Sequence, residues 1–214
     1  VHSFGSLSYF CKANKPEGAP EFCYMGCPVG ETCPYNALKI YACEKSSYIG
    51  RASKKHNPTE EDVRHVLTET NYGRCVFGCD NDVVDHQTVN MEFEDDITVT
   101  FTMSAFNLGG RRIRIMGTKG ELIASAESPV ITYNDLLTQQ TEEININDAV
   151  ASDSIISGHG GGDSGIMCAL YDMLCGNADA AKLSNISISV KNHKIVFAAE
   201  KSRLEGRIVD MSEM

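Results

Sequence analysis

The sequence predicts an α+β fold: a mostly antiparallel, open β-sheet with helices packed on one face. Runs rich in Val, Ile, Thr and Phe follow one another through the middle of the chain and are separated by short turns. Helical patterns precede and follow this block. Successive hairpins form an antiparallel sheet, which usually leaves one face free for helices or a partner.

Length and composition set the class of protein. With 214 residues, we expect residues 1–214 to form a single domain that includes a Cys-rich loop at 11–35. A hydrophobic content of 42% is enough for a core, so global disorder is not expected. The formal net charge of −10 argues against nucleic-acid binding. Because no apolar run approaches about 18 residues, we expect no membrane partner.

The first part of the chain predicts a strand, a long loop and two helices. Apolar and small polar residues alternate over 1–10, as in a strand. Residues 12–34 contain four prolines, three glycines and three cysteines, so something other than a core must hold this loop. Helices are expected over 35–43 and over 57–69, the second with Asn57 as its N-cap.

The middle of the chain predicts the sheet. A tight hairpin is expected at Asp95 and Asp96, and a second turn at the Gly-Thr-Lys-Gly segment 117–120. The expected strands cover 83–94, 97–106, 112–116, 121–125, 130–133 and 142–146.

The last part of the chain predicts two helices. The first has Asp163 as its N-cap and stops at Gly176. The second covers 187–205 and is ended by Gly206. Its apolar face is formed by Val190, Phe197 and Leu204.

The cysteines supply the first candidate site. Cys23, Cys27 and Cys33 lie close together in the loop, and the pair Cys75 and Cys79 follows about forty residues later. Thiolates at short spacing in a Pro- and Gly-rich loop suit tetrahedral zinc, with the fourth ligand from a distant segment. The sequence therefore predicts a structural, closed zinc site formed by Cys23, Cys27, Cys33 and one of Cys75 or Cys79.

Two alternatives remain for these thiols. They could be inert, buried cysteines. They could also hold an iron–sulfur cluster, although Cys33-Pro34 is the only feature of the sequence that favours one. The total of nine cysteines is odd and no signal sequence is recognised, which favours reduced thiols in the cytoplasm.

A glycine run, Gly158 to Gly162, supplies the second candidate site. Glycines before a helix let a ligand approach backbone N–H groups, and His159 and Asp163 could hydrogen-bond hydroxyl groups. Alternatively, Asp163 only caps the helix and the glycines only form a turn. The segment is not a phosphate-binding P-loop, because no Gly-Lys-Ser/Thr follows it.

A third cluster contains Asp80, Asp82, Asp85 and His86. Carboxylates beside a histidine could perform acid–base chemistry or bind a hard cation. We prefer the interpretation of a polar turn that leads into the strand at Val83.

Several segments together resemble the C-terminal domain of Gfo/Idh/MocA-type oxidoreductases. The matching segments are Tyr72–Gln87, Phe101–Phe106, Gly110–Leu122 and Gly158–Asp163. Cys23–Tyr35 and Phe197–Leu204 are similar to one bacterial branch of that family. The resemblance implies an N-terminal Rossmann domain that binds NAD or NADP, followed by this domain, whose open sheet covers the active site and often forms the oligomer interface.

The resemblance also implies roles and limits. It makes His159 and Asp163 candidate ligands of a small-molecule substrate, a sugar, polyol or related hydroxylated compound. The dinucleotide fingerprint and the family's Glu-Lys-Pro catalytic segment do not occur in this sequence, so we expect a C-terminal portion without activity of its own. No catalytic residue is carried over. The alternative is a non-catalytic, zinc-stapled dimerisation module.

Overall fold

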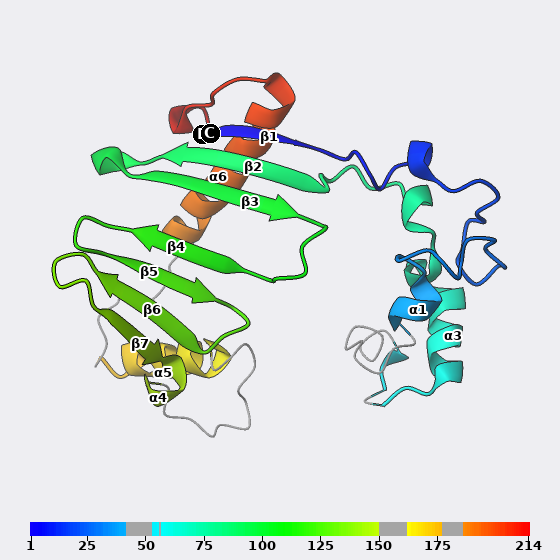
Figure 1. Ribbon diagram of the computed structural model, residues 1–214, viewed down its shortest axis with the longest axis horizontal. Helices are drawn as coiled ribbons and strands as arrows, with labels where there is room; N and C mark the ends of the chain where they lie inside the picture. Colours follow the sequence, from blue (N-terminus) through cyan, green and yellow to red (C-terminus); the bar gives the residue numbers. More distant parts are fainter. Residues whose placement is uncertain (42–52, 56, 150–161, 177–185) are drawn as a thin grey trace. The chain divides into compact units, whose positions relative to one another are not determined.

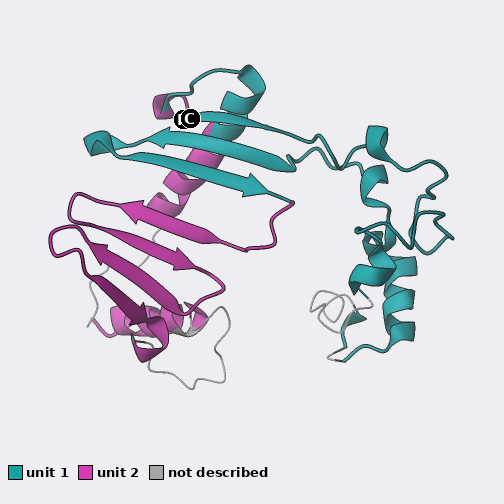
Figure 2. Cartoon of the chain, in the orientation of Figure 1, with its two compact units in different colours: residues 1–105, 199–210 teal, residues 106–198, 211–214 magenta. Residues whose placement is uncertain are grey.

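A computed structural model of the chain describes residues 1–41, 53–55, 57–149, 162–176 and 186–214 (Figure 1). It divides into two compact units (Figure 2). Unit 1 contains residues 1–105 and 199–210, and unit 2 contains residues 106–198 and 211–214. Each unit combines an antiparallel sheet with helices, so the predicted α+β class is confirmed. The strands form two sheets, however, where we expected one.

Unit 1 has a three-stranded antiparallel sheet. Its strands are β1 (His2–Ser6), β2 (His86–Glu92) and β3 (Thr98–Ser104), in the order β1-β2-β3 (Figure 1). The expected hairpin between β2 and β3 is confirmed. Asp95 and Asp96 both have positive φ, which Asp tolerates better than most residues.

The helices of unit 1 follow the cysteine-rich loop. They are α1 (Ala37–Tyr41) and α3 (Glu60–Glu69). Their contact is apolar, and its buried members are Ala37, Val63, Val66 and Leu67. The expectation that Asn57 caps the second helix was wrong. The helix begins later because Thr59 and Asp62 form a capping box, in which each side chain receives a hydrogen bond from the other residue's backbone N–H.

Unit 2 has a four-stranded antiparallel sheet with strands in sequence order. These are β4 (Arg112–Met116), β5 (Gly120–Ser125), β6 (Val130–Asp135) and β7 (Thr141–Asn145). The helices α4 (Ile146–Ala149) and α5 (Gly162–Leu174) also belong to this unit. The register puts Ile113 and Ile115 on one face together with Leu122. That face of the β4–β5 hairpin is therefore apolar.

The last long helix, α6 (Ile186–Glu205), buries a different face from the predicted one. The three residues of the predicted apolar face, Val190, Phe197 and Leu204, are all exposed. Ala198, Ala199 and Ser202 are buried instead. Small side chains let the end of the helix approach β1 closely enough for the Ser3 backbone N–H to donate to Ser202 Oγ, at 2.9 Å.

Candidate metal centre

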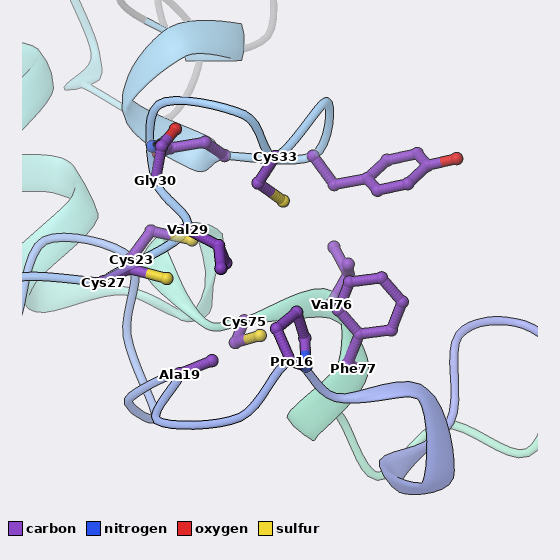
Figure 3. Close-up of a pocket in the computed structure, with 12 residues that line it drawn as sticks. Pro16, Ala19, Cys23, Cys27, Val29, Gly30, Cys33, Cys75, Val76 and Phe77 are labelled. Carbon is purple, nitrogen blue, oxygen red and sulfur yellow. Dashed lines mark hydrogen bonds between the residues drawn. The ribbon is translucent and has the colours of Figure 1, made fainter.

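Four of the five predicted metal ligands line one small pocket in unit 1. The pocket is lined by Pro16, Ala19, Cys23, Cys27, Val29, Gly30, Cys33, Tyr35, Asn36, Cys75, Val76 and Phe77. Figure 3 shows the four thiol side chains directed toward the same space, three from the loop and one from the segment after α3. The structure thus brings together residues that are about forty positions apart in the sequence.

A short antiparallel bridge between Phe22 and Arg74 joins the two segments that carry these thiols. The backbone N–H of Cys23 donates to the Gly73 carbonyl at 2.9 Å, and the N–H of Cys75 donates to the Glu21 carbonyl at 2.8 Å. Cys23 and Cys75 therefore flank the bridge, and their positions are tied to each other by the main chain.

Gly73 allows this bridge to lie close to α3. A β-carbon at Gly73 would lie 2.1 Å from the Leu67 carbonyl oxygen, which is far shorter than any contact between these atoms. The neighbouring Gly78 is different, because a β-carbon there would meet nothing closer than 3.8 Å. Glycine is thus required at residue 73 by close approach of the main chain.

Two consecutive turns bring Cys27 and Cys33 to the pocket. The Gly30 N–H donates to the Cys27 carbonyl at 3.0 Å, and the Cys33 N–H donates to the Val29 carbonyl at 2.8 Å. The Asn36 side chain, which is buried, donates to the Gly30 carbonyl at 2.9 Å and fixes the turns against the start of α1. These local hydrogen bonds set the direction of both thiols.

The surroundings of Cys23 combine burial with nearby thiols. Burial raises the pKa of the Cys23 thiol, and the thiols of Cys75, Cys27 and Cys33 raise it further, because a second negative charge nearby is unfavourable. The backbone N–H of Ala37 donates to the Cys23 sulfur and opposes that rise. A divalent cation among the four sulfurs would reverse the balance, since it stabilises thiolates.

Aromatic rings cover one side of the pocket. Tyr35 and Phe77 line it, with ring centroids 6.1 Å apart. Tyr9 and Phe10 pack against both of these rings, with centroid distances of 5.0–6.1 Å. This cluster was not predicted from the sequence, because its members come from three separate segments. Two of its members, Tyr35 and Phe77, line the same pocket as the four sulfurs.

Cys79, the remaining predicted ligand, does not line the pocket. Its thiol donates to the Cys75 carbonyl at 3.5 Å. Within the described part of the chain, no three or more Cys, His, Asp or Glu side chains are already arranged to hold a metal ion. The four pocket thiols therefore face a common space without being closed around one centre.

The second candidate site is only partly described. His159 lies outside the described residues, and so does the glycine run except for Gly162. Asp163 lies in the first turn of α5 and is exposed. Its expected role as the N-cap was wrong, because the helix already begins at Gly162.

The third cluster contains a buried structural carboxylate, Asp85. One of its oxygens accepts hydrogen bonds from the backbone N–H groups of Ser8, Tyr9 and Phe10, at 2.6–3.3 Å. The other oxygen lies 2.7 Å from His86 Nδ1. Burial raises the pKa of Asp85, but the hydrogen bonds from Tyr9, His86, Phe10 and Ser8 together outweigh it and lower the pKa to about 2.

Asp85 thus joins the end of β1 to the start of β2 and turns the chain toward the cysteine-rich loop. Asp80 is separate from it, since its exposed carboxylate pairs with Arg74 at 3.0 Å. The preferred interpretation of this cluster as a polar turn omitted the anchoring role of Asp85. The sequence carried little signal for this role, because Asp85 lies inside the strand expected over 83–94, whereas the observed strand begins at His86.

Comparison with protein-family models, with curated proteins and with solved structures gave no match. Among the described residues, none of the helices has the length and apolar character needed to cross a membrane.

Proposed function

We propose that this chain is the substrate-side portion of a nicotinamide-dependent oxidoreductase that acts on a sugar, a polyol or a related hydroxylated compound. The observation that supports the proposal most is where the resembling segments lie. Gly110–Leu122 contains all of β4, the following turn and the start of β5, and Phe101–Phe106 contains the end of β3. Both belong to antiparallel sheets, as the resemblance to Gfo/Idh/MocA-type oxidoreductases implies for this domain.

In the proposed enzyme, NAD or NADP is bound by a separate Rossmann domain. All strand pairs among the described residues are antiparallel, whereas a dinucleotide site needs parallel βαβ units and a glycine-rich turn. Hydride passes between a substrate C–H bond and the nicotinamide, and this chain orients the substrate. His159 and Asp163 are the proposed hydroxyl ligands, in a reduced, cytoplasmic protein.

The first test is titration of the isolated chain with NADH, followed by nicotinamide fluorescence. We expect no saturable binding and no turnover, because the backbone that would hold the pyrophosphate is missing from this sequence. Tight binding with one NADH per chain would contradict the assignment of the cofactor to another domain.

The second test concerns the gene upstream of the codon for Val1. We expect it to encode a βαβ unit with Gly-x-Gly-x-x-Gly, and the longer product to oxidise polyols with NAD or NADP. In that product, His159→Ala should raise KM more than it lowers kcat, because the residue is proposed to bind substrate. An upstream sequence without this unit would overturn the proposal.

A second candidate is a non-catalytic dimerisation module stapled by zinc. The convergence of four cysteines on one pocket favours it, since such a module needs no cofactor site. The upstream sequence distinguishes the two candidates, because only the oxidoreductase requires a dinucleotide-binding unit.

A further inference from the structure

We propose that Cys23, Cys27, Cys33 and Cys75 bind one structural Zn²⁺ and that Cys79 is not a ligand. This site is independent of the oxidoreductase proposal, because it would stabilise the loop in either candidate function.

The four thiols of the pocket match the ligand set of a structural zinc site. Zinc in structural sites is held by four ligands in a tetrahedron, and four thiolates are one of its commonest sets. The pocket is lined by this number of thiols, and no other ionisable side chain except the Tyr35 phenol lines it. A site closed by four protein ligands has no open position for water or substrate, so its role is structural.

The loop that carries three of these thiols has little else to order it. None of residues 11–35 is buried, and their only regular element is the 3-10 turn Lys12–Asn14. Loops longer than about 12–15 residues without structure of their own are uncommon in compact domains. A metal ion supplies the free energy of ordering that this segment cannot obtain from a core.

Cys75 and Cys79 differ in where the main chain places their thiols. Cys75 is buried, and the bridge at Arg74 pairs it with Glu21, diagonally across from Cys23, which pairs with Gly73. Cys79 follows a 3-10 turn, Val76–Gly78, that directs its thiol back to the Cys75 carbonyl. The main chain therefore places one member of the pair in the pocket and the other beside it.

The surroundings of the four thiols suit the charge of a zinc–thiolate centre. A Zn²⁺ ion with four thiolates carries a net charge of −2, which needs nearby donors or cations. The Ala37 N–H already donates to the Cys23 sulfur. The Lys15 ammonium lies beside Gly78, three residues after Cys75, since a β-carbon at Gly78 would be 3.8 Å from Lys15 Nζ.

Binding requires the thiols to close inward. Zn–S bonds of about 2.3 Å place tetrahedral sulfurs about 3.8 Å from one another. All three loop cysteines are only partly buried and lie in a segment with little regular structure, where side chains can change rotamer. The four-sulfur arrangement is thus reached by local adjustment of the loop.

The direct experiment measures metal content. The intact chain is purified without chelator in reducing buffer, loaded with Zn²⁺, desalted and analysed by elemental mass spectrometry. We expect one zinc per chain, near-complete loss in Cys75→Ser and Cys27→Ser, and full retention in the matched control Cys79→Ser. Wild type without zinc, or loss in Cys79→Ser with retention in Cys75→Ser, would overturn the proposal.

A second experiment avoids variants that fail to fold. The wild-type chain is alkylated with iodoacetamide before and after zinc removal, and modified residues are located by mass spectrometry. The four ligands should be protected only in the zinc-loaded protein, whereas Cys168 and Cys175, which are exposed, should react in both states. Equal reactivity of the pocket thiols in both states would contradict zinc ligation. Visible absorption together with bound iron and sulfide would assign the site to an iron–sulfur cluster instead.

Discussion

At the scale of single residues, Asp85 organises the chain between β1 and the cysteine-rich loop. Its side chain is only 3% exposed, yet it is ionised at neutral pH because it accepts hydrogen bonds from three backbone N–H groups. Removing the carboxylate would leave those donors without this acceptor.

We expect Asp85→Ala to lower the free energy of unfolding by about 2–3 kcal/mol. The exposed Asp82→Ala is the matched control and should change it little. Urea denaturation of both variants measures the difference. Equal stability of the two would show that the Asp85 hydrogen bonds contribute nothing.

The low pKa of Asp85 also predicts a dependence on pH. Its pKa is about 2 in the folded chain against an ordinary value of 3.8, so its contribution to stability is complete above about pH 4. That contribution is lost as the pH falls toward 2. Denaturation of wild type and Asp85→Asn between pH 6 and pH 2 should therefore show a stability difference that shrinks in this window.

Which residues could be predicted depended on whether their roles are local. Cys23, Cys27 and Cys33 were found because their spacing lies within one loop. The choice of Cys75 over Cys79 depends on a bridge to Phe22, more than fifty residues away, and no local pattern encodes it. The anchoring role of Asp85 was missed for the same reason, since the residues that donate hydrogen bonds to it, Ser8 to Phe10, lie far away in the sequence.

At the scale of elements, strands and turns were predicted better than helix faces. The β4–β5 hairpin followed from alternation and a Gly-x-x-Gly turn, both of which are local. The face that α6 buries was not predicted correctly from the sequence. A helix can pack through small side chains instead of its large apolar ones when it approaches a strand closely, as α6 does at Ser202.

The start of α3 supplies a prediction at this scale. Thr59→Ala removes the capping box and should lower the free energy of unfolding by about 1 kcal/mol, because helix N–H groups lose their acceptor. Thr68→Ala, at an exposed position inside the same helix, is the control and should be neutral or slightly stabilising. Thermal unfolding followed by circular dichroism compares them. A smaller loss in Thr59→Ala than in Thr68→Ala would contradict the cap.

At the scale of the whole molecule, the apolar face of the β4–β5 hairpin is a candidate interface with a partner. Ile113 and Ile115 are 57% and 52% exposed, although they share a face with Leu122. Apolar surfaces of this kind on soluble proteins commonly mark interfaces. We propose that a second copy of the chain covers this face, so that the chain is at least a dimer.

Light scattering at tens of micromolar tests the dimer. Ile115→Lys should give a monomer with unchanged circular dichroism, because a charge on this face opposes association. Glu143→Lys introduces the same side chain on the opposite face and should remain dimeric. A monomeric wild-type chain, or an Ile115→Lys variant that stays dimeric, would contradict this interface.

The end of α6 and the segment after it also supply hydrogen-bond partners to the outer edge of β1, which an edge strand ordinarily lacks. Val1 exchanges two backbone hydrogen bonds with Val209, each 2.9 Å long. The Ser3 N–H, on the same edge of β1, donates to Ser202 Oγ. An unpaired strand margin is a template on which other chains can add strands and aggregate. Here the chain blocks that margin with its own later residues, so the three-stranded sheet is protected there from growing into a polymer.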